Sequence, residues 1–104
     1  MAARVLVSDA ALADLDAARS WLTQPGAGPR AAERLRRITA ALRDLGRHPL
    51  RWPEGEHPGV RERQVEGYRI LYRVASAAGD GGATAAGDVL VARVFGPGQD
   101  RSRL

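Results

Sequence analysis

The stretch "VRERQVEGYRILYRV", residues 60–74, decides the fold because it contains two β-strands and the turn between them. In 68–74, tyrosines and aliphatic residues alternate with Arg69 and Arg73, which is typical of a strand with one buried face, and 60–65 gives a second strand signal. Glu66 and Gly67 separate the two segments, and a two-residue connection ending in glycine indicates a tight β-hairpin.

The sequence before this hairpin predicts a strand and two helices. Residues 3–7, "ARVLV", read as a short strand, and Ser8 is a suitable N-cap for the helix that follows. That helix runs to about Thr23 and is followed by a turn at 24–29. Its apolar residues recur at helical spacing on one face: Ala11, Leu15, Ala18 and Leu22.

The second helix is expected to begin at Pro29, which suits a first helical position, and to end at Gly46 as a C′ residue. Its apolar stripe consists of Leu35, Ile38, Leu42 and Leu45. The arginines off this stripe are interpreted as solvated charges, or alternatively as a footprint for DNA or an acidic protein partner. Two helices joined by a short turn should pack as an antiparallel hairpin.

The remaining sequence completes a β-α-α-β-β-β order. Residues 48–59 contain several prolines and glycines and are expected to form a loop. A third strand of the main sheet is predicted at 88–95, after a Gly/Ala-rich segment at 75–87 that we expect to be a mobile hairpin loop. The prediction is an α+β fold with a small antiparallel sheet packed against a helical hairpin.

Strand alternation assigns the two faces of this sheet. The face expected under the helices carries Ile70, Tyr72, Val74, Leu90, Ala92 and Val94. The other face, which we call the open face, is expected to present Arg69, Arg73 and Arg93, with Leu71, Val91 and Phe95 among the charges. Arg61 and Arg63 are expected to join them. The alternative is an ordinary solvated strand face.

Composition limits the function classes. The chain of 104 residues is expected to form a single domain over 1–104, with a flexible tail from about residue 96. There is no cysteine, which excludes disulfides and thiolate chemistry. No signal peptide or membrane span is recognisable, so a cytoplasmic location is expected. All 16 basic residues are arginine and the net charge is +4, which favours an anionic partner.

The order and spacing of several segments resemble the RelE/ParE superfamily of type II toxin–antitoxin toxins. "ALADLDAARSWL" and "AAERLRRITAALRDLGRHPLRW" resemble the two helices and the loop after them. "GVRERQVEGYRILYRV" is the strongest match, and "DVLVARVFGPGQDRSRL" looks like the last strand and tail. The resemblance implies a cognate antitoxin whose C-terminal segment, acidic in charge, covers the toxin. It leaves open a homodimer or a toxin–antitoxin hetero-oligomer.

Two activities are known in this superfamily, and the residues favour one of them. A RelE-like ribonuclease acts on mRNA at the ribosome and needs a base, an acid and cations. Glu62 is the candidate base here, but no His, Tyr or Lys follows the last strand. The candidate cations are Arg61, Arg69, Arg73 and Arg93. The favoured interpretation is therefore a ParE-like inhibitor that binds DNA gyrase without chemistry of its own; the ribonuclease is the alternative.

If the protein acts by binding, the expected contact residues lie on the strands and in the tail. They are Arg61, Arg63, Arg69, Arg73, Arg93, Phe95, Arg101 and Arg103. A frayed polar tail is the alternative for the last two. No cofactor or metal is expected, since His48 and His57 lie in a loop without further ligands at suitable spacing. Tyr68, Tyr72 and Trp21 are expected to pack, Trp21 across a dimer seam if there is one; Trp52 is expected to pack or to mark a contact surface.

Overall fold

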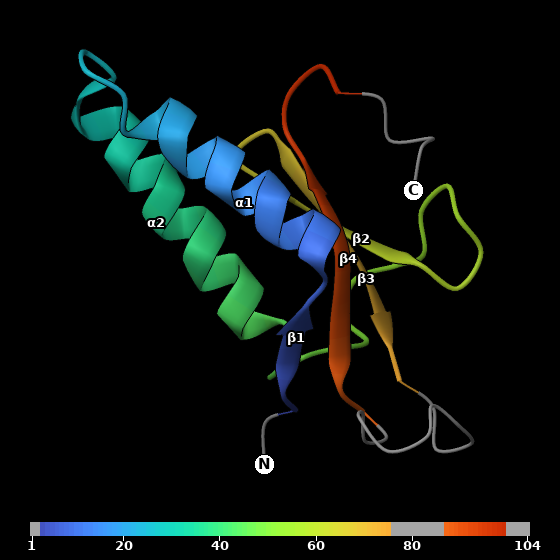
Figure 1. The fold of residues 1–104 in the computed structure, drawn as a ribbon. Helices are drawn as coiled ribbons and strands as arrows, with labels where there is room; N and C mark the ends of the chain where they lie inside the picture. The colour runs from blue at the N-terminus through green and yellow to red at the C-terminus, as the bar shows by residue number, and fades with distance from the viewer. Residues whose placement is uncertain (1–2, 76–86, 100–104) are drawn as a thin grey trace.

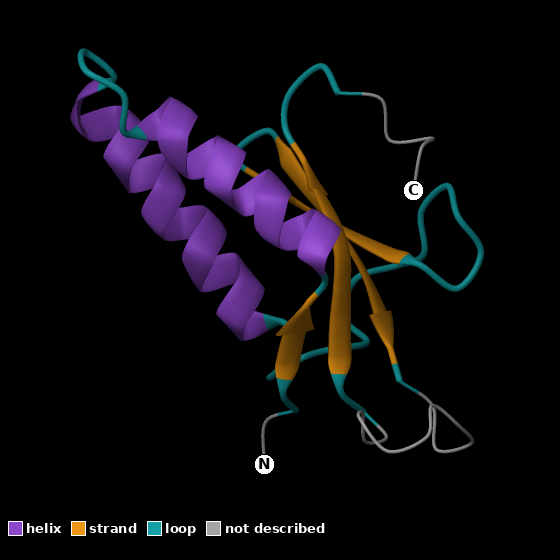
Figure 2. Ribbon diagram, in the orientation of Figure 1, coloured by secondary structure: helices purple, strands orange, loops and turns teal. Residues whose placement is uncertain are grey.

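The computed structural model describes residues 3–75 and 87–99, and these form two layers (Figure 1). Both helices lie on one face of a four-stranded sheet, as the colouring by secondary structure makes clear (Figure 2). No helix in this part of the chain is long and apolar enough to cross a bilayer. The elements in chain order are β1 (Val5–Val7), α1 (Asp9–Leu22), α2 (Gly28–Asp44), β2 (Arg61–Val65), β3 (Tyr68–Val74) and β4 (Val89–Phe95).

The sheet is mixed rather than wholly antiparallel. Its strand order is β1-β4-β3-β2, and β2, β3 and β4 are antiparallel to their neighbours. β1 adds to the edge of β4 in the parallel direction, with Val5 opposite Val89. The predicted α+β order is therefore confirmed, and the short first strand supplies the parallel pairing that its sequence alone did not reveal.

The helix boundaries follow from local chemistry. The Ser8 hydroxyl accepts a hydrogen bond from the Ala11 N–H at 3.0 Å, which confirms the predicted N-cap of α1. The same hydroxyl donates to the Ala92 carbonyl at 2.8 Å, so the cap also fixes the start of α1 to β4. Pro29 lies in the first turn of α2, where a missing N–H costs no hydrogen bond.

The β2–β3 turn is the tight hairpin that its sequence predicts. Glu66 and Gly67 have φ angles of 51° and 80°, which a two-residue type I′ turn requires at both positions. A left-handed glutamate is uncommon, and two arginines of α2 hold it. Arg34 donates to the Glu66 carbonyl at 2.9 Å, and Arg37 donates to its carboxylate at 2.6 Å. The turn is thereby fixed to α2.

A β-bulge in β4 changes the predicted faces of that strand. Leu71 is paired with Arg93 and Tyr72 with Val91, so Ala92 is an extra residue. Val94 keeps its predicted place under the helices, but Val89 and Val91 join it there. The expectation that Leu90 and Ala92 face the helices, and Val91 the open face, was wrong because the bulge reverses the alternation.

The main core lies between the helices and the sheet. Ile38, Leu45, Ile70 and Tyr72 are almost completely buried in it, as their periodicity predicts. The Tyr72 hydroxyl donates to the Pro49 carbonyl at 2.8 Å. Burial raises the pKa of Tyr72 above its usual value, so this phenol stays protonated as a structural donor.

Gly46 follows α2 for a different reason from the one predicted. Its φ is not positive, so it is not a left-handed C′ residue. Instead, the segment that leads into β1 passes very close: the Ala3 N–H donates to the Gly46 carbonyl at 2.8 Å. A Cβ at this position would lie 2.5 Å from the Ala3 carbonyl oxygen. Glycine is thus required by the close contact of two backbones.

We expect Gly46→Ala to lower the free energy of unfolding by about 1–3 kcal/mol, because the added methyl group forces β1 away from the end of α2. Urea unfolding followed by circular dichroism would measure this. Gly46→Asn distinguishes the two explanations. A left-handed C′ position tolerates Asn, whereas a close contact should make Asn at least as destabilising as Ala. An unchanged unfolding midpoint in Gly46→Ala would contradict the assignment.

Candidate functional site

The predicted basic open face is smaller than the sequence suggested. Arg69 and Arg73 of β3 do lie on it, since Ile70 and Tyr72 between them face the helices. Leu71 lies between the two arginines and is fully buried with Val60, which ends the loop before β2, and with Phe95. This second apolar cluster occupies the centre of the face, so Arg69 and Arg73 are separated by packed side chains.

The loop before β2 borders the open face beside Arg69. Its chain pairs with the start of β2, with the Glu62 N–H donating to the Pro53 carbonyl at 3.0 Å. The Glu62 carboxylate accepts from the Glu56 N–H at 3.0 Å and lies against Gly55. Glu62 therefore helps to hold the loop against the start of β2. A depression of about 490 Å³ remains, lined by Pro53, Glu54, Gly55, Glu56, Glu62 and Arg69.

Arg93 forms an ion pair with a carboxylate of α1. Its guanidinium donates to both carboxylate oxygens of Asp14, at 2.8 and 2.9 Å, and lies 4.5 Å from the centre of the Phe95 ring. The same carboxylate accepts the Val94 N–H at 2.8 Å. The hydrogen bonds to Asp14 raise the pKa of Arg93 further above its already high value. This bidentate pair joins the first half of α1 to the bulged end of β4 and leaves Arg93 little capacity for a ligand.

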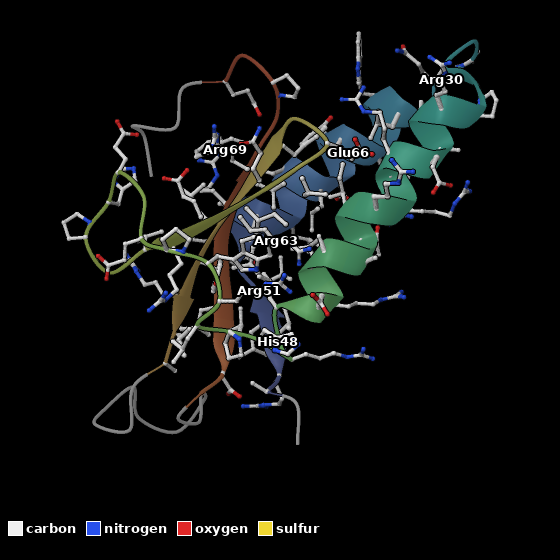
Figure 3. The ribbon with its side chains drawn as sticks, turned by 180° about the vertical axis from the view of Figure 1, so that it is seen from behind. Arg30, His48, Arg51, Arg63, Glu66 and Arg69 are labelled. Carbon is white, nitrogen blue, oxygen red and sulfur yellow. The ribbon has the colours of Figure 1, made fainter. Side chains whose placement is uncertain are left out.

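Arg61 and Arg63 do not lie on the open face, contrary to the prediction. They are opposite Tyr72 and Ile70, whose side chains face the helices, so they project to the helix side. Figure 3 shows Arg63 between the sheet and α2, while Arg69 lies on the other side of the sheet. Arg61 donates to the Trp52 carbonyl at 2.6 Å and to the Leu50 carbonyl at 3.2 Å, which holds the loop after α2.

Arg63 forms one wall of a groove between α2 and β2. It donates to the Ala41 carbonyl at 3.0 Å, lies 3.5 Å from the Asp44 carboxylate, and stacks on the ring of Trp52 with its guanidinium carbon 4.6 Å from the ring centre. Trp52 is half-buried and packs against the main core, so packing is its role in this chain. Within the described residues, Arg63 Nε is the buried side-chain polar atom that lacks a hydrogen-bond partner.

This groove, which we call the basic groove, is larger than the depression beside Arg69, at about 570 Å³. Four arginines and a single aspartate line it, above an apolar floor. Sequence reasoning treated the α2 arginines as solvated and missed the groove, because their convergence with Arg63 depends on how α2 crosses the edge strand. The lining residues are Arg37, Ala40, Ala41, Arg43, Asp44, Arg47, Arg63 and Val65.

Other predicted contributors are absent from these surfaces or lie outside the described residues. Arg101 and Arg103, most of the 75–87 segment, and the tail beyond Gln99 belong to the undescribed part. His48 is exposed, and the described residues contain no group of three His, Asp or Glu side chains suited to a metal. Trp21 is 65% exposed at the end of α1, so it is not buried within this single chain, and its packing across a dimer seam stays a prediction.

The comparisons with known proteins agree with this architecture. Residues 5–100 match the family described as ParE toxin of type II toxin–antitoxin system, parDE. The chain is similar to a solved structure described as the chromosomal ParDE TA system from P. aeruginosa, with a TM-score of 0.67 and 19% identity over 91% of this chain and 96% of that chain. It is also similar to the toxin–antitoxin complex RelBE2 from Mycobacterium tuberculosis, with a TM-score of 0.55 and 22% identity over 90% of this chain and 96% of that chain.

No curated protein sequence gives a significant match. The family match nevertheless spans almost the whole chain, and the solved structures share its two helices and small sheet. The chain belongs to the ParE toxin family of type II toxin–antitoxin systems. The resemblance to the RelE/ParE superfamily is confirmed.

We expect Asp14→Ala to destabilise the protein by about 2–4 kcal/mol, because it leaves both a half-buried guanidinium and the Val94 N–H without an acceptor. Asp16→Ala, on the exposed side of the same helix, is the matched control and should change stability by less than about 0.5 kcal/mol. Thermal and urea unfolding of both variants provide the measurement. Equal stability of the two variants would show that Arg93 is not held in solution as described.

Proposed function

We propose that this protein is a ParE-like toxin that inhibits DNA gyrase by binding it, in the cytoplasm, and that a cognate antitoxin neutralises it. The single observation that carries this proposal is that the side chains considered for catalysis are already held in structural contacts within the chain. Glu62 anchors a loop, Arg93 is paired with Asp14, and Arg61 holds backbone carbonyls. These contacts suit a binding scaffold better than a reaction centre.

RNA cleavage would need more than the described residues offer. A base must reach the 2′-hydroxyl and an acid must protonate the leaving oxygen. Tyr72 is buried and its hydroxyl is bound to a carbonyl, and Tyr68 is also buried. Arg69 and Arg73 can stabilise negative charge, but arginine does not exchange protons at neutral pH. The match to the ParE family, rather than to a nuclease family, also favours a binding inhibitor over a ribonuclease.

An antitoxin partner is supported by both structural relatives, which are described as a ParDE system and a RelBE2 toxin–antitoxin complex. The net charge of +4 and the arginines of the basic groove suit an acidic protein segment. For gyrase, the proposed contact surface is the open face around Arg69 and Arg73. The undescribed Arg101 and Arg103 of the tail are proposed as additional contacts.

The purified protein is expected to inhibit DNA supercoiling by gyrase at stoichiometric excess, without any other factor. Arg69→Glu/Arg73→Glu should raise the concentration needed for half inhibition by about tenfold or more, since reversing charges at a contact surface weakens association. Arg19→Glu/Arg30→Glu changes the net charge equally at exposed positions on the helices and should leave inhibition within about twofold. Supercoiling that proceeds normally in the presence of folded wild-type protein would overturn the proposal.

Primer extension on cellular mRNA after a short pulse of expression tests the ribonuclease alternative. If the protein inhibits gyrase, we expect intact mRNA together with arrested growth and induction of the DNA-damage response. New 5′ ends inside codons, lost in Arg69→Ala, would instead establish a RelE-like activity on the open face. Coexpression of the product of the adjacent gene should restore growth if that product is the antitoxin.

A further inference from the structure

We propose that a pocket between the end of α1 and the segment after β4 receives an aromatic side chain of gyrase. Trp21 forms one wall of this pocket, which we call the aromatic pocket, and the Tyr68 hydroxyl is its hydrogen-bonding group. This inference rests on the proposed function for the identity of the partner, but the pocket is a property of this chain alone. Three features carry it: an exposed tryptophan, an unpaired hydroxyl beside it, and the position of the pocket next to the open face.

The residues after β4 form the second wall of the aromatic pocket. Pro97 and Gly98 are the central residues of a β-turn, in which the Gln99 N–H donates to the Gly96 carbonyl at 3.2 Å. Gly98 has a φ of 80°, which is typical of the third position of a type II turn, and proline is common at the second. The side-chain oxygen of Gln99 also accepts the Gly96 N–H. This wall is therefore held by its own hydrogen bonds.

The lining of the aromatic pocket is close to neutral. The pocket has a volume of about 420 Å³, and its one charged lining residue is Asp14. Both carboxylate oxygens of Asp14 are already occupied, by the Arg93 guanidinium and the Val94 N–H. An ion entering here would lose hydration without gaining a counter-ion. A neutral guest with a large apolar surface suits the lining better.

Tyr68 supplies a hydrogen-bonding group that the described residues do not use. It is only 6% exposed, and its hydroxyl forms no hydrogen bond within residues 3–75 and 87–99. The hydroxyl is not fully enclosed, so it reaches water at the pocket that Tyr68 lines. A buried tyrosine usually finds a partner for its hydroxyl, as Tyr72 does at the Pro49 carbonyl. The Tyr68 hydroxyl is therefore available to a guest.

Trp21 offers the guest an aromatic surface. A single exposed apolar side chain is ordinary on a protein surface, but this one borders a pocket. Tryptophan is among the residues that most often dominate the binding energy of protein interfaces, where it pairs with similar residues of the partner. An aromatic guest with a polar tip, such as a tyrosine side chain, would pack against the indole and hydrogen-bond to the Tyr68 hydroxyl.

The position of the aromatic pocket favours the target protein over a second copy of this chain. Arg69, which is proposed as a gyrase contact, is opposite Phe95 in the ladder between β3 and β4, and the second wall begins at the next residue, Gly96. The sequence after this wall contains Arg101 and Arg103. A partner bound at Arg69 is thereby brought to the pocket. Two copies of this chain would each carry a net charge of +4, and their repulsion opposes a dimer.

The gyrase supercoiling assay tests the aromatic pocket with three single variants. Trp21→Ala should raise the concentration needed for half inhibition by about tenfold or more, as the loss of an interface tryptophan does. Tyr68→Phe removes only the hydroxyl, so it should raise this concentration by about threefold or more and leave the urea unfolding midpoint unchanged. Leu50→Ala is the matched control, because Leu50 is also 65% exposed but lies in the loop after α2. It should leave inhibition within about twofold.

A direct titration tests the aromatic pocket without gyrase. The probe is the capped amino acid N-acetyl-L-tyrosinamide, added to the wild-type protein and followed by amide NMR spectra. N-acetyl-L-alaninamide, which has no ring, is the control. We expect saturable shifts at the Trp21 indole N–H and at the backbone N–H groups of Gly98 and Gln99 with the tyrosine probe only. Trp21→Ala should abolish them, and Tyr68→Phe should weaken binding of the probe several-fold.

The outcomes separate the aromatic pocket from the proposed function. If the wild-type protein inhibits gyrase and all three variants inhibit it equally, the proposal is overturned. If gyrase is not inhibited at all, the proposed target fails; probe binding that depends on Trp21 then still supports the pocket, whereas no probe binding overturns the pocket as well. A wild-type dimer that Trp21→Ala converts to a monomer in analytical ultracentrifugation would overturn the proposal in favour of a second copy of this chain.

Discussion

The extra residue in β4, Ala92, determines which side chains of that strand face the helices. Before it, Val89 and Val91 point into the main core, and after it Val94 does. The bulge also brings Val94 N–H and Arg93 within reach of one carboxylate on α1. Asp14 therefore supplies hydrogen-bond acceptors at the point where the bulge interrupts the ladder between β3 and β4. The position of α1 over the sheet depends on this irregularity and on its acceptor.

The same arrangement separates the two faces of the sheet by function. Arginines of β2 on the helix side hold loop carbonyls and stack on Trp52. On the open face, Arg69 and Arg73 are left beside a small apolar cluster. The sequence suggests a continuous basic surface on the open face. In the structure, this face carries two arginines, Arg69 and Arg73, that are separated by packed apolar side chains. The larger concentration of positive charge lies around the edge of β2, where α2 contributes most of it.

The sequence predicts the elements well because their signals are local. The Ser8 cap, the Glu66–Gly67 turn and the apolar stripe of α2 each act over a few residues, and all three are confirmed. Strand faces were less predictable, since one inserted residue reverses them and Ala92 carries no distinguishing chemistry. The basic groove could not be predicted at all. It arises where two segments far apart in the chain meet, and strand alternation says nothing about such a meeting.

The parallel pairing of β1 with β4 has a consequence for the order of folding. Arg4, the residue before β1, binds Asp88 across 84 positions of the chain. Such a contact closes a long loop, whereas the β2–β3 hairpin closes over two residues, so the hairpin can form early and β1 docks late. During synthesis, β1 is made first but cannot pair until β4, the last strand, has been made. The sheet is complete only after β4 has left the ribosome, so a nascent chain cannot present the finished surface of the protein.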